Sequence, residues 1–275
     1  MRLKDKVILV TASTRGIGLA IVKKCAAEGA RVYLAARDLD RAQEMAKTLS
    51  GTKCVYNDAT KPETFTSMVE DVVRDAGRID VLVNNFGTSN PGKDLDFANT
   101  DPQIFLDTVT LNLRSVFMAS QAAVKHMANH GGSIINISSV GGLVPDISQV
   151  AYGTSKAAIN YLTKLIAVQE AKHHIRCNAV LPGMTATELF DSHEGSSFIE
   201  KFAPSAEKTA KKIVRRLKRG RKMIVTGADA HLMSGLRRIF GRGALKLFAF
   251  FIKAVKFPMF KRTFYKGKNK NEKID

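Results

Sequence analysis

A tyrosine and a lysine one helical turn apart could move a proton to or from a substrate oxygen. Tyr152 and Lys156 lie four residues apart in the segment Y-G-T-S-K, and Ser139 lies thirteen residues before Tyr152. Positions i and i+4 of a helix share one face, so the ammonium can lower the pKa of the phenol. Tyr152 would then protonate a carbonyl oxygen or, as phenolate, accept the proton of an alcohol. Ser139 would hydrogen-bond the same oxygen.

Two further roles complete this set. Lys156 could also hold the ribose of a nicotinamide, and Asn112, in a predicted long helix, could hold a water that relays protons behind Lys156. Each residue alone has a simpler explanation, because Tyr–Lys pairs are common on helices and a serine after a strand usually lies in a turn. All four at these spacings favour a catalytic group of Asn112, Ser139, Tyr152 and Lys156.

A glycine-rich turn near the N-terminus is suited to a dinucleotide. Residues 11–18 read T-A-S-T-R-G-I-G and follow the apolar run Val7 to Val10, although Ala12 stands where a first glycine is usual. Between a strand and a helix, such a turn lets backbone N–H groups meet a pyrophosphate. The predicted cofactor contacts in this turn are Thr11, Ser13, Thr14, Arg15, Gly16, Ile17 and Gly18.

The end of the second predicted strand indicates which dinucleotide binds. Binding sites for NAD place an acidic residue there for the ribose 2′-hydroxyl. This chain has Ala35-Ala36-Arg37, and Asp38 comes one position later. Arg15 and Arg37 could both face a 2′-phosphate, because a planar guanidinium matches phosphate oxygens. We therefore predict NADP as the cofactor; the alternative is two solvated surface arginines.

Strands and helices alternate along most of the chain. The predicted strands are 7–10, 31–36, 53–56, 79–83, 133–137, 175–181 and 223–226, and the predicted helices are 17–28, 41–49, 63–76, 102–127, 151–170 and 205–219. This order predicts an α/β fold, a Rossmann-like doubly wound parallel sheet in three layers. We expect one catalytic domain over residues 1–228 and a basic, helical C-terminal extension over 229–275.

Composition suits one large domain in a reducing compartment. The 275 residues include three cysteines with no metal-ligand spacing, so we predict no metal site. The N-terminus enters a strand at once, and no apolar run reaches the roughly 18 residues of a membrane-spanning helix. We expect a cytoplasmic protein, with possible peripheral contact at a membrane surface.

The basic charge is concentrated at the C-terminal end. The net charge is +18, and residues 205–275 hold 21 Lys/Arg against 4 Asp/Glu. Within residues 245–257 three lysines fall within about 80° of a helical wheel, beside a wide Phe/Leu face. This segment could pack on the body or a neighbouring subunit, lie on an anionic membrane, or bind nucleic acid. Phenylalanines without a stacking platform argue against nucleic acid.

Together these motifs resemble the short-chain dehydrogenase/reductase family. The resemblance covers T-A-S-T-R-G-I-G, N-D-A-T (57–60), N-N-F-G (84–87), the helix of Asn112, Ser139, Y-G-T-S-K and N-A-V-L-P-G (178–183). Within the family the chain is most similar to the bacterial 7α-hydroxysteroid dehydrogenases that act on bile acids. The stretches shared with them include V-Y-L-A-A-R, V-P-D-I-S-Q-V-A-Y and I-R-C-N-A-V-L-P-G.

The resemblance implies an NADP(H)-dependent enzyme that interconverts a secondary alcohol and a ketone on an apolar, steroid-like substrate. It also implies a homo-oligomer, a dimer or tetramer. Family roles place Asp58 and Ala59 near the adenine and Asn85 near its ribose. Phe86 and Gly87 are also predicted to bind the cofactor. They place Pro182, Gly183, Thr185 and Thr187 around the nicotinamide and pyrophosphate.

Departures from the family pattern keep other interpretations open. Phe86 replaces the usual alanine, and the V-D-G-G end that helps to build the family tetramer is missing. Residues 184–204, where the family closes on substrate, diverge after about residue 188. A general carbonyl or 3-oxoacyl-thioester reductase is therefore an alternative. A non-catalytic NADPH-binding membrane scaffold is another, although the intact Ser139, Tyr152 and Lys156 oppose it.

Overall fold

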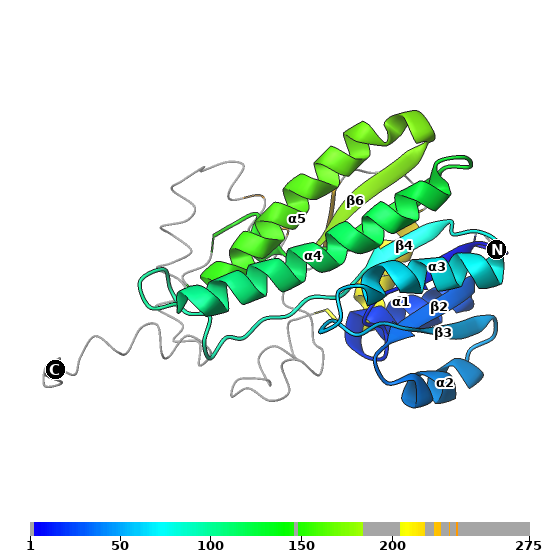
Figure 1. Cartoon of the computed structure of the whole chain (residues 1–275), viewed down its shortest axis with the longest axis horizontal. Helices are drawn as coiled ribbons and strands as arrows, with labels where there is room; N and C mark the ends of the chain where they lie inside the picture. Colours follow the sequence, from blue (N-terminus) through cyan, green and yellow to red (C-terminus); the bar gives the residue numbers. More distant parts are fainter. Residues whose placement is uncertain are drawn as a thin grey trace, which may run out of the picture.

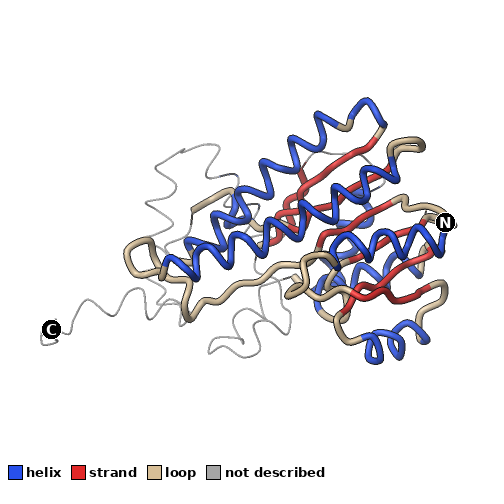
Figure 2. The backbone as a smooth tube through the Cα atoms, in the orientation of Figure 1, coloured by secondary structure: helices blue, strands red, loops and turns tan. Residues whose placement is uncertain are grey.

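The computed structural model describes residues 3–145, 148–183, 204–217 and 223–226, with residues 231 and 235. A seven-stranded sheet lies at its centre in the order β3-β2-β1-β4-β5-β6-β7 (Figures 1 and 2). Every strand pair is parallel. The strands are β1 (Val7–Val10), β2 (Arg31–Ala36), β3 (Thr52–Tyr56), β4 (Val81–Asn84), β5 (Gly132–Ile137), β6 (Ile175–Pro182) and β7 (Met223–Thr226). The predicted doubly wound fold is confirmed.

Helices cover both faces of this sheet, as the crossovers between parallel strands require. They are α1 (Gly16–Ala26), α2 (Leu39–Lys47), α3 (Thr64–Ala76), α4 (Pro102–Met127), α5 (Val150–Gln169) and α7 (Ala206–Leu217), with short 3₁₀ turns η1 (Val140–Gly142) and η2 (Ala171–His173). Figure 1 shows α3, α4 and α5 side by side on the face toward the viewer.

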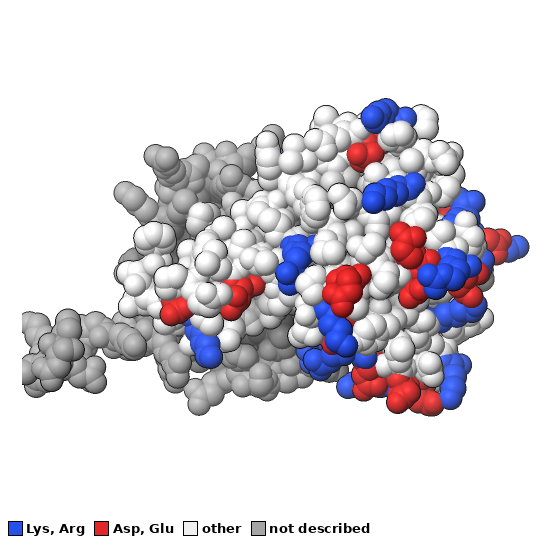
Figure 3. All heavy atoms as spheres, in the orientation of Figure 1, with Lys and Arg blue, Asp and Glu red and all other residues white. Residues whose placement is uncertain are grey.

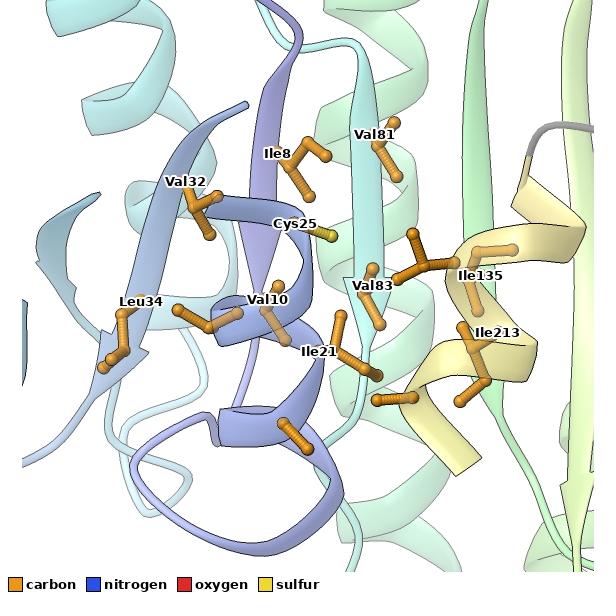
Figure 4. Close-up of a cluster of buried hydrophobic side chains, with 14 of the residues drawn as sticks. Ile8, Val10, Ile21, Cys25, Val32, Leu34, Val81, Val83, Ile135 and Ile213 are labelled. Carbon is orange, nitrogen blue, oxygen red and sulfur yellow. The ribbon is translucent and has the colours of Figure 1, made fainter. Parts of the chain in front are cut away.

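Alternate residues of each central strand enter two separate cores. On β1, Ile8 and Val10 join α1 and α7 on one face, while Val7 and Leu9 join α3 and α4 on the other. Figure 4 shows the first core, with Ile21 of α1 and Ile213 of α7 facing the strand side chains. Strands buried on both faces appear in sequence as unbroken apolar runs, and this is why these strands could be predicted.

α7 is an amphipathic helix with a basic outer face. Ala206, Ala210, Ile213 and Val214 are buried against the first core, and α7 packs along α1. Its exposed face carries Glu207 and four cations, Lys208, Lys211, Lys212 and Arg215. The predicted basic helix therefore exists as far as Leu217, and its predicted end at 219 lies outside the described residues.

The remaining differences from the expected elements are small. β4 begins at Val81 rather than at residue 79, and Asp80 just before it bonds to Val7 through both its backbone N and its side chain. Most of the extension predicted for 229–275 lies outside the described residues. Among the residues described, no helix has the length and apolar character needed to cross a bilayer, and no cluster of metal-ligating side chains occurs.

Candidate active site

The predicted reacting groups meet where the carboxyl ends of β4 and β5 face α5. The Lys156 Nζ lies 5.5 Å from the centre of the Tyr152 ring, and the Ser139 side chain is near enough to Tyr152 to lower the pKa of its phenol. Lys156 is 3% exposed, and its Nζ donates to the carbonyl oxygen of Ile137 at 3.0 Å. Three of the four predicted catalytic residues therefore form one contiguous group.

Burial shifts both titratable groups of this cluster toward their neutral forms. Burial lowers the pKa of the Lys156 ammonium from 10.5 to about 8. Burial also raises the pKa of the Tyr152 phenol, and the nearby Ser139 side chain acts in the opposite direction. At neutral pH the phenol thus carries its proton, which is the form that a general acid requires.

Asn112 joins the loop after β4 to α5. Its Oδ1 accepts from Thr88 N at 2.8 Å, and its Nδ2 donates to Thr88 O at 2.9 Å and to Ser155 Oγ at 3.0 Å. Both N–H groups of this fully buried amide are used, so only a lone pair of Oδ1 is left for the predicted water. Thr88 and Ser155 were not predicted as part of the site, because their partner is far away in sequence.

Gly87 allows this loop to approach the lysine closely. A Cβ built on Gly87 would lie 2.8 Å from Lys156 Nζ and 4.0 Å from Asn112 Oδ1. Contacts under 3.0 Å are not sustained by real Cβ atoms, so any larger residue at position 87 must displace the ammonium. The predicted Gly87 is thus placed beside the reacting groups.

The glycine-rich turn has the shape of an anion cradle. A Cβ on Gly18 would lie 2.6 Å from Ala12 O and from Asn85 Nδ2, so only glycine fits there. Arg15, the N-cap of α1, makes no side-chain hydrogen bond to the first turn, which leaves these N–H groups for a ligand. Ala12 has φ 48°, a left-handed conformation that favours the glycine usual at this position. These residues fit a dinucleotide phosphate.

Thr11 and Asn85 hold the cradle against the end of β4. The Thr11 Oγ1 accepts from the backbone N atoms of Asn85 and Phe86, both at 2.9 Å. Asn85 Nδ2 returns hydrogen bonds to Ala12 O at 3.0 Å and to Thr11 O at 3.2 Å. Ser13 is buried with its Oγ donating to Val10 O at 2.8 Å. These predicted cofactor residues therefore shape the cradle.

At the end of β2 the two predicted arginines remain accessible. Arg15 and Arg37 are both exposed. The Asp38 side chain accepts from Arg41 N at 3.0 Å and so caps α2. After β3, hydrogen bonds from Thr60 hold the pKa of Asp58 below its usual value, and the nearby Arg37 adds to this effect.

The other predicted cofactor residues are placed as follows. The Phe86 ring packs edge-on against Phe65, with ring centroids 5.8 Å apart, and so belongs to the second core. Pro182 ends β6, and Gly183 N donates to Thr226 O at 2.9 Å. Thr14, Ile17 and Ala59 are half-buried. Thr185 and Thr187 lie outside the described residues.

The family model described as short chain dehydrogenase matches residues 6–196. The chain belongs to the short-chain dehydrogenase family. It is therefore an oxidoreductase, and short-chain dehydrogenases use NAD or NADP. The strand ends, cradle and α5 groups described above all fall within the matched residues.

The chain is also similar in sequence or structure to individual dehydrogenases. A 7alpha-hydroxysteroid dehydrogenase of Clostridium sardiniense is 46% identical over 206 residues, which cover 73% of this chain and 79% of the relative. A 3alpha-hydroxysteroid dehydrogenase of Mediterraneibacter gnavus is 39% identical over 196 residues. The crystal structure of acetoin dehydrogenase from Salmonella typhimurium superposes with a TM-score of 0.71 at 30% identity, covering 80% of this chain and 94% of that one.

Proposed function

We propose that the protein is an NADP(H)-dependent dehydrogenase that interconverts a secondary alcohol and a ketone on a hydroxysteroid or bile-acid-like substrate. The observation that carries this proposal is the group formed by Ser139, Tyr152 and Lys156 on one side of α5. The similarity to 7alpha- and 3alpha-hydroxysteroid dehydrogenases supports the substrate class.

In this proposal the chain supplies the proton, while the nicotinamide supplies or accepts the hydride. For ketone reduction, the Tyr152 hydroxyl donates its proton to the carbonyl oxygen as the hydride reaches the carbonyl carbon. The Ser139 hydroxyl, which lies beside the Tyr152 phenol, donates to the same oxygen. The Lys156 ammonium stabilises the phenolate that remains, and Asn112 holds a water that returns the proton.

The preference for NADP over NAD rests on the residues after β2. An NAD site needs a carboxylate on the ribose 2′-hydroxyl, but the Asp38 side chain is occupied as the cap of α2. The exposed Arg37 is available to a 2′-phosphate, and Arg15 at the start of α1 is exposed as well.

We also propose a homo-oligomer in the cytoplasm. Large apolar side chains are exposed on α4 and α5, and Figure 3 shows a broad surface over these two helices with few charged side chains. They are Leu106, Phe117, Tyr161, Leu165 and Val168. Soluble monomers rarely expose large contiguous apolar patches, and we propose that a second copy of the chain covers these side chains. The segment 229–275 is proposed as a basic extension that either packs on the body or a neighbouring subunit or contacts an anionic membrane surface.

Turnover assays with wild-type protein and Tyr152→Phe test the proposal. NADPH oxidation is measured with a keto-bile acid and with an acetoacetyl thioester. We expect turnover of the keto-bile acid, and a loss of roughly 10²–10⁴-fold in kcat for Tyr152→Phe with NADPH binding retained. Preference for the thioester would instead indicate a 3-oxoacyl reductase. A phenylalanine variant that keeps more than about half of the wild-type rate would exclude Tyr152 from the reaction.

A further inference from the structure

A fully buried carboxylate reaches the start of α5 from a distant loop. Asp94 lies between β4 and α4 and is 0% exposed. Its Oδ1 accepts from Ala151 N at 2.9 Å, and its Oδ2 accepts from Tyr152 N at 2.8 Å. One of the two hydrogen bonds thus ends on the backbone of the proposed proton donor.

α5 depends on this loop because its own sequence does not cap it. Gln149, the N-cap residue, has the left-handed angles φ 59° and ψ 48° and makes no side-chain capping hydrogen bond. Besides the two amides held by Asp94, Val150 N donates to Leu95 O at 3.2 Å. Two consecutive loop residues therefore satisfy the first three N–H groups of the helix. A carboxylate at this end also interacts favourably with the helix dipole.

The loop itself is held in place on both sides of Asp94. Asp94 N donates to Asn90 O at 2.7 Å. Leu95 N donates to Thr100 Oγ1 at 2.8 Å, and the Thr100 hydroxyl donates to Asp96 O at 2.9 Å. A buried anion with both oxygens engaged in a braced loop can fix the position of a helix end.

We propose that Asp94 is a positioning residue for the reaction. It fixes the position of the first turn of α5, and therefore the position of the Tyr152 phenol relative to Ser139, which follows β5. This inference rests on the proposed role of Tyr152. Because reacting groups lose rate steeply when they are misplaced by about 1 Å, a small shift of this turn lowers the rate without touching the cofactor cradle.

The variant Asp94→Asn keeps the shape of the side chain but replaces one acceptor oxygen with an NH₂ donor. One of the two α5 amides then loses its partner. Asp80→Asn is the control, because Asp80 is 7% exposed and also accepts from a backbone N–H, Val7 N at 3.0 Å, at the start of β1 and away from α5. Asp80 also pairs with Lys6 and Arg78. Both variants should lower the melting temperature.

Measuring kcat below the melting temperature of each variant separates an effect on the position of Tyr152 from a loss of folding stability. We expect Asp94→Asn to lower kcat by about 10- to 100-fold with the Kd for NADPH unchanged, and Asp80→Asn to keep the wild-type kcat. Thr100→Val, a milder change that only loosens the loop, should lower kcat in the same direction by a smaller factor. This second variant gives the answer even if Asp94→Asn does not fold.

Wild-type kcat in folded Asp94→Asn, or equal losses in Asp94→Asn and Asp80→Asn, overturns the positioning role. Tyr152→Phe in the same assay keeps this outcome distinct from a failure of the proposed function. If Tyr152→Phe is fully active, the proposed proton donor is wrong. The role of Asp94 in holding the helix end is then tested by amide hydrogen exchange at residues 150–152. The exchange rate must rise in Asp94→Asn and stay unchanged in Asp80→Asn.

Discussion

Replacing Lys156 with methionine should stabilise the cofactor-free protein near neutral pH while it abolishes turnover. Lys156 is 3% exposed, and burial lowers its pKa from 10.5 to about 8. At about 1.4 kcal/mol for each pH unit, this shift corresponds to roughly 3 kcal/mol spent on burying the ammonium. Methionine removes that cost but leaves Ile137 O without its 3.0 Å donor, which costs about 1–3 kcal/mol.

The pH dependence of this stability difference separates the contribution of the Lys156 charge from those of the lost hydrogen bond and the altered packing. Between pH 8 and 10.5 the unfolded lysine holds its proton while the folded lysine has lost it, so the stability of the wild type rises with pH in this range. The lost hydrogen bond and the altered packing do not depend on pH. The advantage of Lys156→Met over the wild type should therefore shrink by about 2 kcal/mol between pH 7 and 9.5.

Urea unfolding of both proteins at several pH values measures this difference. Lys164→Met is the control, because Lys164 is exposed on the same helix and its ammonium stays in water in both states. We expect the control to differ from the wild type by a constant amount at every pH. If Lys156→Met shows a difference that is constant with pH, the pKa of Lys156 is not lowered in the folded protein, and the reasoning fails.

Three further predictions concern the loop after β4, the cofactor and the tail. Gly87→Ala should fold but lower kcat by about tenfold, because its Cβ would meet Lys156 Nζ at 2.8 Å; an unchanged kcat would contradict this. Arg37→Asp should flatten or reverse the preference for NADPH over NADH in kcat/KM. Equal kcat/KM of the wild type with both coenzymes would refute the proposed NADP preference. Phe248→Glu combined with Phe251→Glu should weaken salt-sensitive co-sedimentation with anionic vesicles. If the wild-type protein does not bind such vesicles at low salt, the tail instead packs on the body or on a neighbouring subunit.

Those parts of the molecule that depend on local pattern could be predicted from the sequence. The strands are buried on both faces, so each appears as an apolar run. The i, i+4 spacing alone places Tyr152 and Lys156 on one side of α5. The order of strands and helices then brings Ser139 beside them, because β4 and β5 pair in parallel and end at the same edge.

Contacts between distant segments could not be predicted in this way. Asp94 and Tyr152 are 58 residues apart, and nothing near Asp94 distinguishes it from a solvated loop aspartate. Phe86 is expected near the cofactor from its motif position, and its ring also packs on Phe65, a contact that the motif does not indicate. The partner of such a side chain depends on which loop crosses which helix, and apolar periodicity carries no information about that.

The position of α5 shows why a parallel sheet can hold these reacting groups so closely. The helix supplies Tyr152 and Lys156, and neighbouring segments hold its first two turns. Asp94 binds the first turn, Asn112 binds Ser155 in the next, and Ser138 Oγ donates to Lys156 O at 3.0 Å. Two of these restraints come from segments that follow β4 and β5 and one comes from α4, so the sheet and α4 together fix the position of the phenol relative to Ser139. Substitutions in these supporting residues should therefore lower kcat before they affect cofactor affinity.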